Sequence, residues 1–144
     1  SRQTPIQLTP NMKLVIAAVV LTLFIVVKAE LTLEQLKKLK DHRENCIKES
    51  GADPEVVAKA RTGNIAEDPK LQEHLLCMFK RIGFMSQEGK IQRDVLRRKL
   101  VDVIKDEELA DKLIGECVVE ASTSQLTALE SFKCFFTKTG LPIV

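Results

Sequence analysis

Four cysteines are the residues of this sequence whose chemistry is easiest to assign. Cys46, Cys77, Cys117 and Cys134 are separated by 30, 39 and 16 intervening residues. Zinc sites use cysteine or histidine pairs about two to four residues apart, and no such pair occurs, so we expect no metal site. An even number of cysteines in a short exported chain indicates disulfide bonds. Four cysteines permit three pairings, and their spacing does not choose among them.

The other reactive side chains form no catalytic motif. The two histidines, His42 and His74, lack HExxH spacing, and the sequence has no GxSxG turn, phosphate-binding loop or GxGxxG turn. The carboxylates are spread along amphipathic faces, where solvated charge is their ordinary role. We therefore predict that the protein is not an enzyme and needs no cofactor. Both histidines are expected at exposed helical positions, because histidine is rarely fully buried.

The N-terminal region has the pattern of a secretory signal peptide. Lys13 precedes an apolar run from Leu14 to Val27, and Val27 and Ala29 suit the −3 and −1 positions of a cleavage site. The rival interpretation is a membrane anchor, but spanning a bilayer takes roughly 20 apolar residues. We predict an upstream segment at residues 1–11, a signal peptide at 12–29 and a mature domain at 30–144 that is secreted into extracellular fluid.

Removal of that peptide changes the charge balance. The whole chain carries 22 basic and 20 acidic residues. Loss of Arg2, Lys13 and Lys28 leaves 19 basic residues and a net charge of −1. No net positive field remains to attract nucleic acid or anionic lipid, so neither is an expected partner.

The mature region is predicted to be all-α. Apolar residues recur at three- and four-residue steps, and no segment alternates as a strand does. Thr32 and Gln35 form a capping box, so the first helix is expected to begin at Leu33 and to end near Gly51. Five more helices are predicted at residues 55–61, 69–82, 91–104, 106–121 and 125–138. Such a small core benefits from disulfides.

These residues resemble the insect odorant-binding protein family, the pheromone-binding and general odorant-binding carriers. The family has six cysteines, with the second and third separated by three residues and the last two by eight. Its third helix runs into an I-G-[FL]-M turn, which matches Ile82 to Met85 after Cys77. The sequence places Cys46 at the first cysteine position, Cys77 at the third, Cys117 at the fourth and Cys134 at the sixth.

Two cysteines of that pattern are missing together. The second would fall at Glu73 and the fifth at Gln125, and these two are partners in the family. The chain thus resembles the four-cysteine, minus-C branch, which implies the bridges Cys46–Cys77 and Cys117–Cys134. The absent bridge would have tied the third helix to the sixth, so we expect a more deformable ligand site and a broader ligand choice.

The resemblance implies a secreted carrier that holds a small hydrophobic ligand, such as an odorant or pheromone, in a central apolar cavity among six short helices. Its expected partners are that ligand and a membrane receptor, and it is expected to be a monomer or weak dimer without a membrane span in its mature form. The predicted lining residues are apolar and lie on inward helical faces: Leu39, Leu75, Phe79, Phe84, Met85, Leu96, Leu100, Ile114, Val118, Leu129, Phe132 and Phe135.

Polar contacts to the ligand are expected to be few, because the chain has no Trp or Tyr. The candidate donors are Ser86, Gln125, Thr127 and Ser131. Residues 141–144 form a tail that can cover an opening but is too short to fill a pocket.

Two alternatives to an odorant carrier share most of these features. One is a non-sensory haemolymph carrier of lipidic molecules, which only tissue expression would distinguish. The other is a secreted helical signal that binds a protein and has no cavity. A saposin-like, membrane-perturbing module has a different cysteine pattern.

Overall fold

The computed structural model describes the backbone of residues 10–144 and the side chains of residues 11–16 and 33–144. The chain divides into two compact units, Ser1–Lys38 and Leu39–Val144, which are described separately. The predicted upstream segment lies almost wholly outside the described residues. Across the described residues, no helix combines the length and the apolar character that crossing a bilayer requires.

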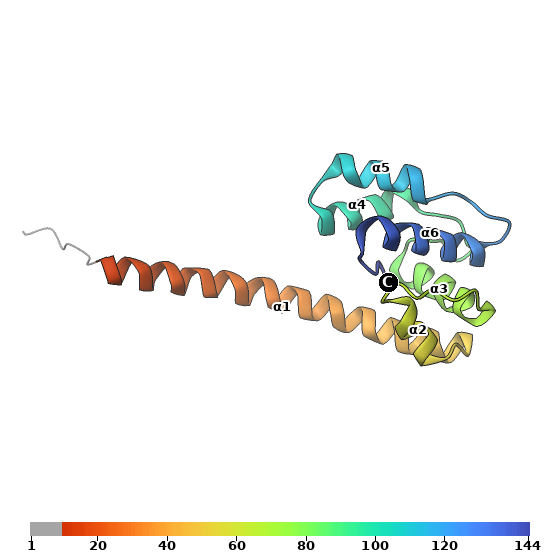
Figure 1. Ribbon diagram of the computed structural model, residues 1–144, viewed down its shortest axis with the longest axis horizontal. Helices are drawn as coiled ribbons and strands as arrows, with labels where there is room; N and C mark the ends of the chain where they lie inside the picture. The colour runs from red at the N-terminus through yellow and green to blue at the C-terminus, as the bar shows by residue number, and fades with distance from the viewer. Residues whose placement is uncertain (1–9) are drawn as a thin grey trace, which may run out of the picture. The chain divides into compact units, whose positions relative to one another are not determined.

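The first helix is much longer than predicted. Helix α1 covers Pro10–Ser50 (Figure 1), so the expected start at Leu33 is wrong. Neither glycine nor proline occurs between Asn11 and Ser50. Each further residue of a helix already formed adds a hydrogen bond without a new nucleation cost, and the helix therefore continues through Thr32 rather than starting there.

An aspartate N-cap begins each of the next two helices, as the sequence predicts. Helix α2 covers Pro54–Ala60 and α3 covers Pro69–Ile82. The Oδ1 atom of Asp53 accepts a hydrogen bond from the Glu55 amide at 2.8 Å, and that of Asp68 accepts one from the Lys70 amide at 2.7 Å. Proline then occupies the first turn, where its missing N–H costs nothing. Gly83 ends α3 with φ of 91°, a left-handed conformation that glycine adopts easily.

The last three helices are α4 at Arg93–Ile104, α5 at Glu107–Cys117 and α6 at Ser124–Thr139. Helix α5 ends four residues before the predicted Ala121. The carbonyl oxygen of Val118 accepts a hydrogen bond from Arg93 Nη2 at 3.0 Å instead, and the Ala121 amide donates to Thr127 Oγ1 at 2.9 Å. These two hydrogen bonds satisfy the Val118 carbonyl and the Ala121 amide outside a helix. Helix α5 can therefore end at Cys117 without leaving these backbone groups unpaired.

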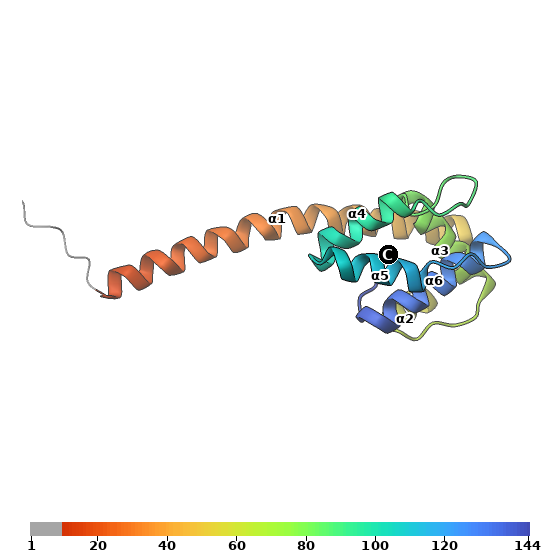
Figure 2. The same ribbon diagram turned by 90° about the horizontal axis from the view of Figure 1, so that it is seen from above.

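Helix pairs form the core of the Leu39–Val144 unit (Figures 1 and 2). Helix α3 packs against α6, α4 pairs with α5, and α5 also contacts α6. Phe79, Phe132 and Phe135 are fully buried at the centre of this arrangement. The described residues contain one isolated antiparallel bridge, between Met85 and Ile91, and no strand. The all-α prediction is confirmed.

Both implied disulfides are present. Cys46 of α1 is bonded to Cys77 of α3, with Cα atoms 5.6 Å apart, and Cys117 of α5 is bonded to Cys134 of α6, with Cα atoms 5.3 Å apart. The two bridges therefore link α1 to α3 and α5 to α6. Neither holds α2 or residues 141–144.

A hydrogen bond occupies the place of the missing third bridge. Gln125 Nε2 at the start of α6 donates to Glu73 Oε1 of α3 at 2.9 Å. These are the two positions at which the family pattern puts the absent cysteines. Their proximity supports the predicted register. At this point of the packed interface between α3 and α6, a solvent-exposed hydrogen bond stands in place of a covalent bond.

Candidate ligand site

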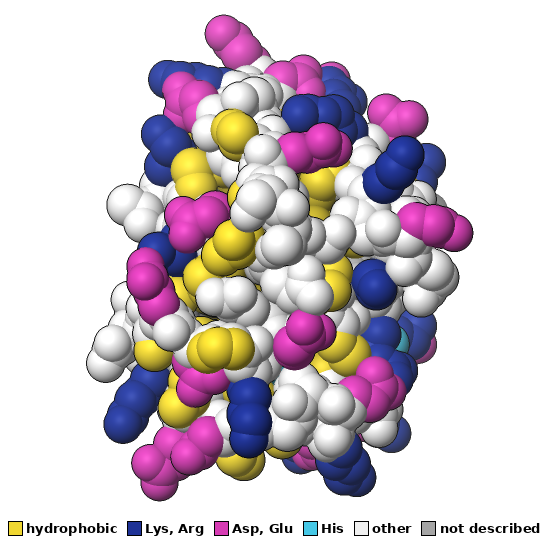
Figure 3. All heavy atoms as spheres, turned by 90° about the vertical axis from the view of Figure 1, so that its right-hand side faces the viewer, with side chains coloured by type: hydrophobic (Ala, Val, Ile, Leu, Met, Phe, Trp, Pro, Cys, Tyr) yellow, Lys and Arg dark blue, Asp and Glu magenta, His cyan; other side chains and the backbone are white. Residues whose placement is uncertain are grey.

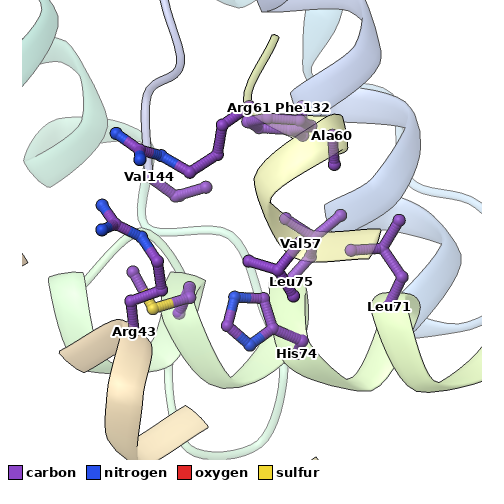
Figure 4. Close-up of a pocket in the computed structure, with 10 residues that line it drawn as sticks. Arg43, Val57, Ala60, Arg61, Leu71, His74, Leu75, Phe132 and Val144 are labelled. Carbon is purple, nitrogen blue, oxygen red and sulfur yellow. The ribbon is translucent and has the colours of Figure 1, made fainter. Parts of the chain in front are cut away.

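A small pocket lies between α2, α3 and α6 in the Leu39–Val144 unit (Figure 4). Its volume is about 10 Å³, roughly the space that one water molecule needs. Apolar side chains form most of its wall, and three nitrogen-bearing side chains complete it: Arg43, Arg61 and His74. The apolar lining residues are Val57, Ala60, Leu71, Leu75, Met78, Phe132 and Val144.

Local sequence explains how α2 comes to cover this pocket. The Asp53 cap and Pro54 start the helix, and Val57 and Ala60, three residues apart, fall on its buried face. The helix is only seven residues long, and Arg61 at its end turns back toward the pocket. Helix α2 is thus a short cover, held by a few apolar contacts and by no disulfide.

His74 is buried inside the pocket wall. Its side chain is 2% exposed, so the prediction of an exposed histidine is wrong for this residue. Burial, aided by the charge of the nearby Arg43 and opposed by a hydrogen bond to the Cys46 backbone, lowers the pKa of His74 to about 4. The imidazole is therefore neutral at ordinary pH, and its Nδ1 atom has no hydrogen-bond partner among the described residues.

Arg43 and Arg61, here called the arginine pair, place two cations beside each other. Both are half-buried, and Figure 4 shows their guanidinium groups on the same side of the pocket, near Val144. Burial and the charge of Arg61 lower the pKa of Arg43, whereas Glu44 raises it. Within the described part of the chain, neither arginine forms an ion pair, and the buried Nε of Arg61 has no acceptor.

The twelve predicted lining residues divide into core and pocket. Eleven are buried, and Leu39 is half-buried. Two of them, Leu75 and Phe132, line the pocket. The other buried ones belong to the close-packed core: Phe79, Phe84, Met85, Leu96, Leu100, Ile114, Val118, Leu129 and Phe135.

The predicted polar donors have mostly found partners within the protein. Gln125 bonds to Glu73, Thr127 donates to the Thr123 carbonyl at 3.0 Å, and Ser86 Oγ accepts from the Lys90 amide at 3.2 Å. Ser131 differs, because its hydroxyl is fully buried on α6 without a hydrogen-bond partner in the described structure. It remains the one predicted donor that is both buried and unpaired there.

The sequence reasoning missed all three nitrogen-bearing residues of the pocket. A signal for His74 was available, since Leu71, His74, Leu75 and Met78 follow the spacing of one helical face. No local pattern marks the arginine pair. Arg43 lies within α1 and Arg61 caps the end of α2, and the two come together only through the packing of these helices.

Comparison with known proteins identifies the family of this chain. A sequence model of the PBP/GOBP family matches residues 28–138. The chain belongs to this family. Tenebrio molitor B2 protein is 40% identical over 114 residues, which cover 79% of this chain and 88% of that protein, and B1 protein is 37% identical over a similar span.

Three solved structures are similar to this chain in fold. A fatty acid binding protein from the oral disk of the blowfly Phormia regina has a TM-score of 0.61 and 26% identity, covering 74% of this chain and 93% of that one. Odorant Binding Protein 7 from Anopheles gambiae, in complex with an azo compound, has a TM-score of 0.59 and 29% identity, covering 72% and 85%. A carrier protein from yellow meal worm has a TM-score of 0.54 and 35% identity, covering 65% and 86%.

Proposed function

We propose that this PBP/GOBP protein is a secreted carrier, not an enzyme, that takes up a small hydrophobic ligand between α2, α3 and α6. Its relatives include proteins whose names describe fatty acid binding, carriage and odorant binding. The observation that carries the proposal is the pocket itself: an apolar wall deep in the helical core that also contains a buried, unpaired imidazole nitrogen. Buried polar atoms in folded proteins nearly always have a partner, so an unpaired one in a pocket favours a ligand or water there.

The pocket must enlarge to hold such a ligand. Small-molecule sites have volumes of about 300–1,000 Å³, and this pocket has about 10 Å³. The flexible side chain of Met78 can change rotamer, and α2 and Val144 can move outward because no disulfide holds them. The predicted central cavity is therefore proposed as an induced space that opens from this pocket into the surrounding core.

The remaining predicted core residues would contact the ligand's far end as the space grows. The aromatic side chains Phe79, Phe132 and Phe135 offer large apolar area, and Ser131 offers an unpaired hydroxyl. We expect affinities in the micromolar range, about −8 kcal/mol, from burial of apolar ligand surface.

Displacement of an apolar fluorescent probe from the oxidised protein tests this proposal. Medium-chain alcohols, esters, terpenoids and aromatics should compete for one saturable site. Ala60→Leu fills the pocket and should weaken binding at least tenfold, because a buried pocket cannot accept extra methyl groups without strain. Ala128→Leu is the matched control, since Ala128 is equally buried but does not line the pocket.

Absence of saturable binding, in protein with both disulfides and native helicity, would refute the carrier function. It would favour the alternative of a secreted helical signal that binds another protein. On the face drawn in Figure 3, acidic and basic side chains are interspersed and apolar atoms appear between them. Secretion is tested separately, by sequencing the N-terminus of the protein released from cells, which we expect near Glu30.

A further inference from the structure

We propose that the ligand carries a carboxylate head group, bound by the arginine pair, with its hydrocarbon part in the pocket beyond. This inference rests on the proposed carrier function and adds the chemical class of the ligand. It assigns Arg43 and Arg61 as the residues that determine specificity.

The first argument is the missing counter-charge. Two other arginines of the Leu39–Val144 unit have acidic partners: Arg81 pairs with Glu49, and Arg97 lies 2.6 Å from Asp111 and 3.2 Å from Glu107. Two more form no ion pair, but Arg98 is exposed to solvent and Arg93 donates to the Val118 carbonyl. The arginine pair has no such partner within the described residues. Glu44 is near enough to affect Arg43, but it is exposed and lies 3.8 Å from Lys40.

The second argument is the unpaired donor. Arg61 Nε is buried with no acceptor, although the guanidinium is charged at every ordinary pH. A charged, buried N–H without an acceptor is unfavourable and rare in folded proteins. An incoming anion that reaches this nitrogen would satisfy it, whereas an alcohol or ester would supply no charge.

The third argument concerns shape and polarity together. Two guanidinium groups on one side of the pocket present the planar, forked donors that match a carboxylate. The rest of the wall is apolar apart from His74, which is neutral and adds no attraction for a second negative charge. One anionic head with an apolar chain is the ligand that satisfies both halves of the site.

Chain-matched ligands test the proposal on the unaltered protein. Dodecanoate, dodecanol, methyl dodecanoate and dodecyl phosphate are compared by probe displacement at pH 7.5, where a carboxylic acid of pKa about 4 to 5 is ionised. Dodecanoate should bind at least tenfold more tightly than dodecanol or the ester. Equal affinities for acid and alcohol would overturn the inference, and so would tighter binding of the phosphate. If either of these results were found but dodecanol still bound, the carrier function would be retained and only the carboxylate proposal would fail. If none of the four ligands bound, the carrier function would be refuted as well.

Substitutions locate the effect. Arg61→Met and Arg43→Met keep the apolar stem and remove the charge, so each should lower the ratio of acid to alcohol affinity roughly tenfold and leave dodecanol binding within twofold. Arg98→Met is the control, because Arg98 is exposed on α4 and outside the pocket. An acid preference that survives both pocket substitutions would overturn the assignment. If either of these variants fails to fold, Arg61→Lys takes its place. Lysine keeps the charge but loses the forked pair of N–H donors, so this variant should lower the ratio of acid to alcohol affinity by a smaller factor.

Discussion

Replacement of Glu73 and Gln125 by cysteine should restore the disulfide that this chain lacks. The two side chains already meet across α3 and α6, with Gln125 Nε2 2.9 Å from Glu73 Oε1. These are also the positions of the paired cysteines in the family pattern, so the double variant Glu73→Cys/Gln125→Cys should oxidise to a protein with three bridges. The native pairs Cys46–Cys77 and Cys117–Cys134 should remain.

The size of the gain follows from the loop that the new bond closes. Residues 73 and 125 are 52 positions apart. The chain-entropy treatment of a loop of that length gives about 4 kcal/mol of stabilisation, because the unfolded chain loses freedom. Loss of one exposed hydrogen bond costs about 0.5–1.5 kcal/mol. The net increase in the free energy of unfolding should then be about 3 kcal/mol, or a rise in Tm of roughly 10–20 °C for a unit of this size.

Urea unfolding of the oxidised variant, with thiol counting and peptide mapping, measures both consequences. The control is Glu73→Ser/Gln125→Ser, which removes the same hydrogen bond and leaves side chains of cysteine's size that cannot cross-link. A variant that keeps two free thiols under oxidising conditions would refute the placement of α3 against α6. A bridge that forms but leaves stability at the level of the serine control would refute the entropic argument.

Three further outcomes are expected. The pKa of His74 is about 4 in the folded protein and about 6.5 in the unfolded chain, so between these pH values the unfolded state binds one more proton. The free energy of unfolding should therefore fall by about 3 kcal/mol from pH 7 to pH 4. Urea unfolding of the His74→Gln variant over the same pH range should lack this part of the loss. His74 stays neutral from pH 5 to 7.5, so the affinity for an uncharged ligand such as dodecanol, measured by probe displacement, should be flat there, and a sigmoid change would contradict this. Deletion of residues 141–144 exposes the pocket beside Val144 and should raise the rate of probe association in stopped-flow measurements severalfold; an unchanged rate would mean that the tail does not limit entry.

Much of the fold was predictable because its signals are local. The Asp53 and Asp68 caps, with proline after each, fixed the starts of α2 and α3 to within a residue. The two disulfides followed from the cysteine register of the family. The start of α1 and the end of α5 were wrong for opposite reasons. A capping box does not interrupt a helix that is already propagating, and α5 stops because Arg93, 25 residues away, takes the Val118 carbonyl.

The site was predicted less well than the fold. Helical periodicity identified residues that are buried, and eleven of the twelve predicted lining residues are buried. Periodicity cannot say which buried face borders a pocket, and only Leu75 and Phe132 do. The arginine pair depends on how α2 packs over α3, which no spacing along the chain reveals. Charged residues are mostly exposed to solvent, so these two arginines carried no signal.

The small pocket and the missing bridge are two aspects of one mechanism. A ligand that needs hundreds of Å³ can bind only a state in which the pocket has opened, and its apparent affinity falls by the fraction of molecules in that state. The disulfides fix α1 to α3 and α5 to α6, so opening must use the parts they leave free: α2, residues 141–144 and the contact between α3 and α6. An exposed hydrogen bond at that contact resists opening far less than a covalent bond would. On the proposed carrier function, we expect a chain without the third bridge to open more readily and to accept ligands of more shapes. The arginine pair would then supply selection by charge that the deformable wall cannot supply by shape.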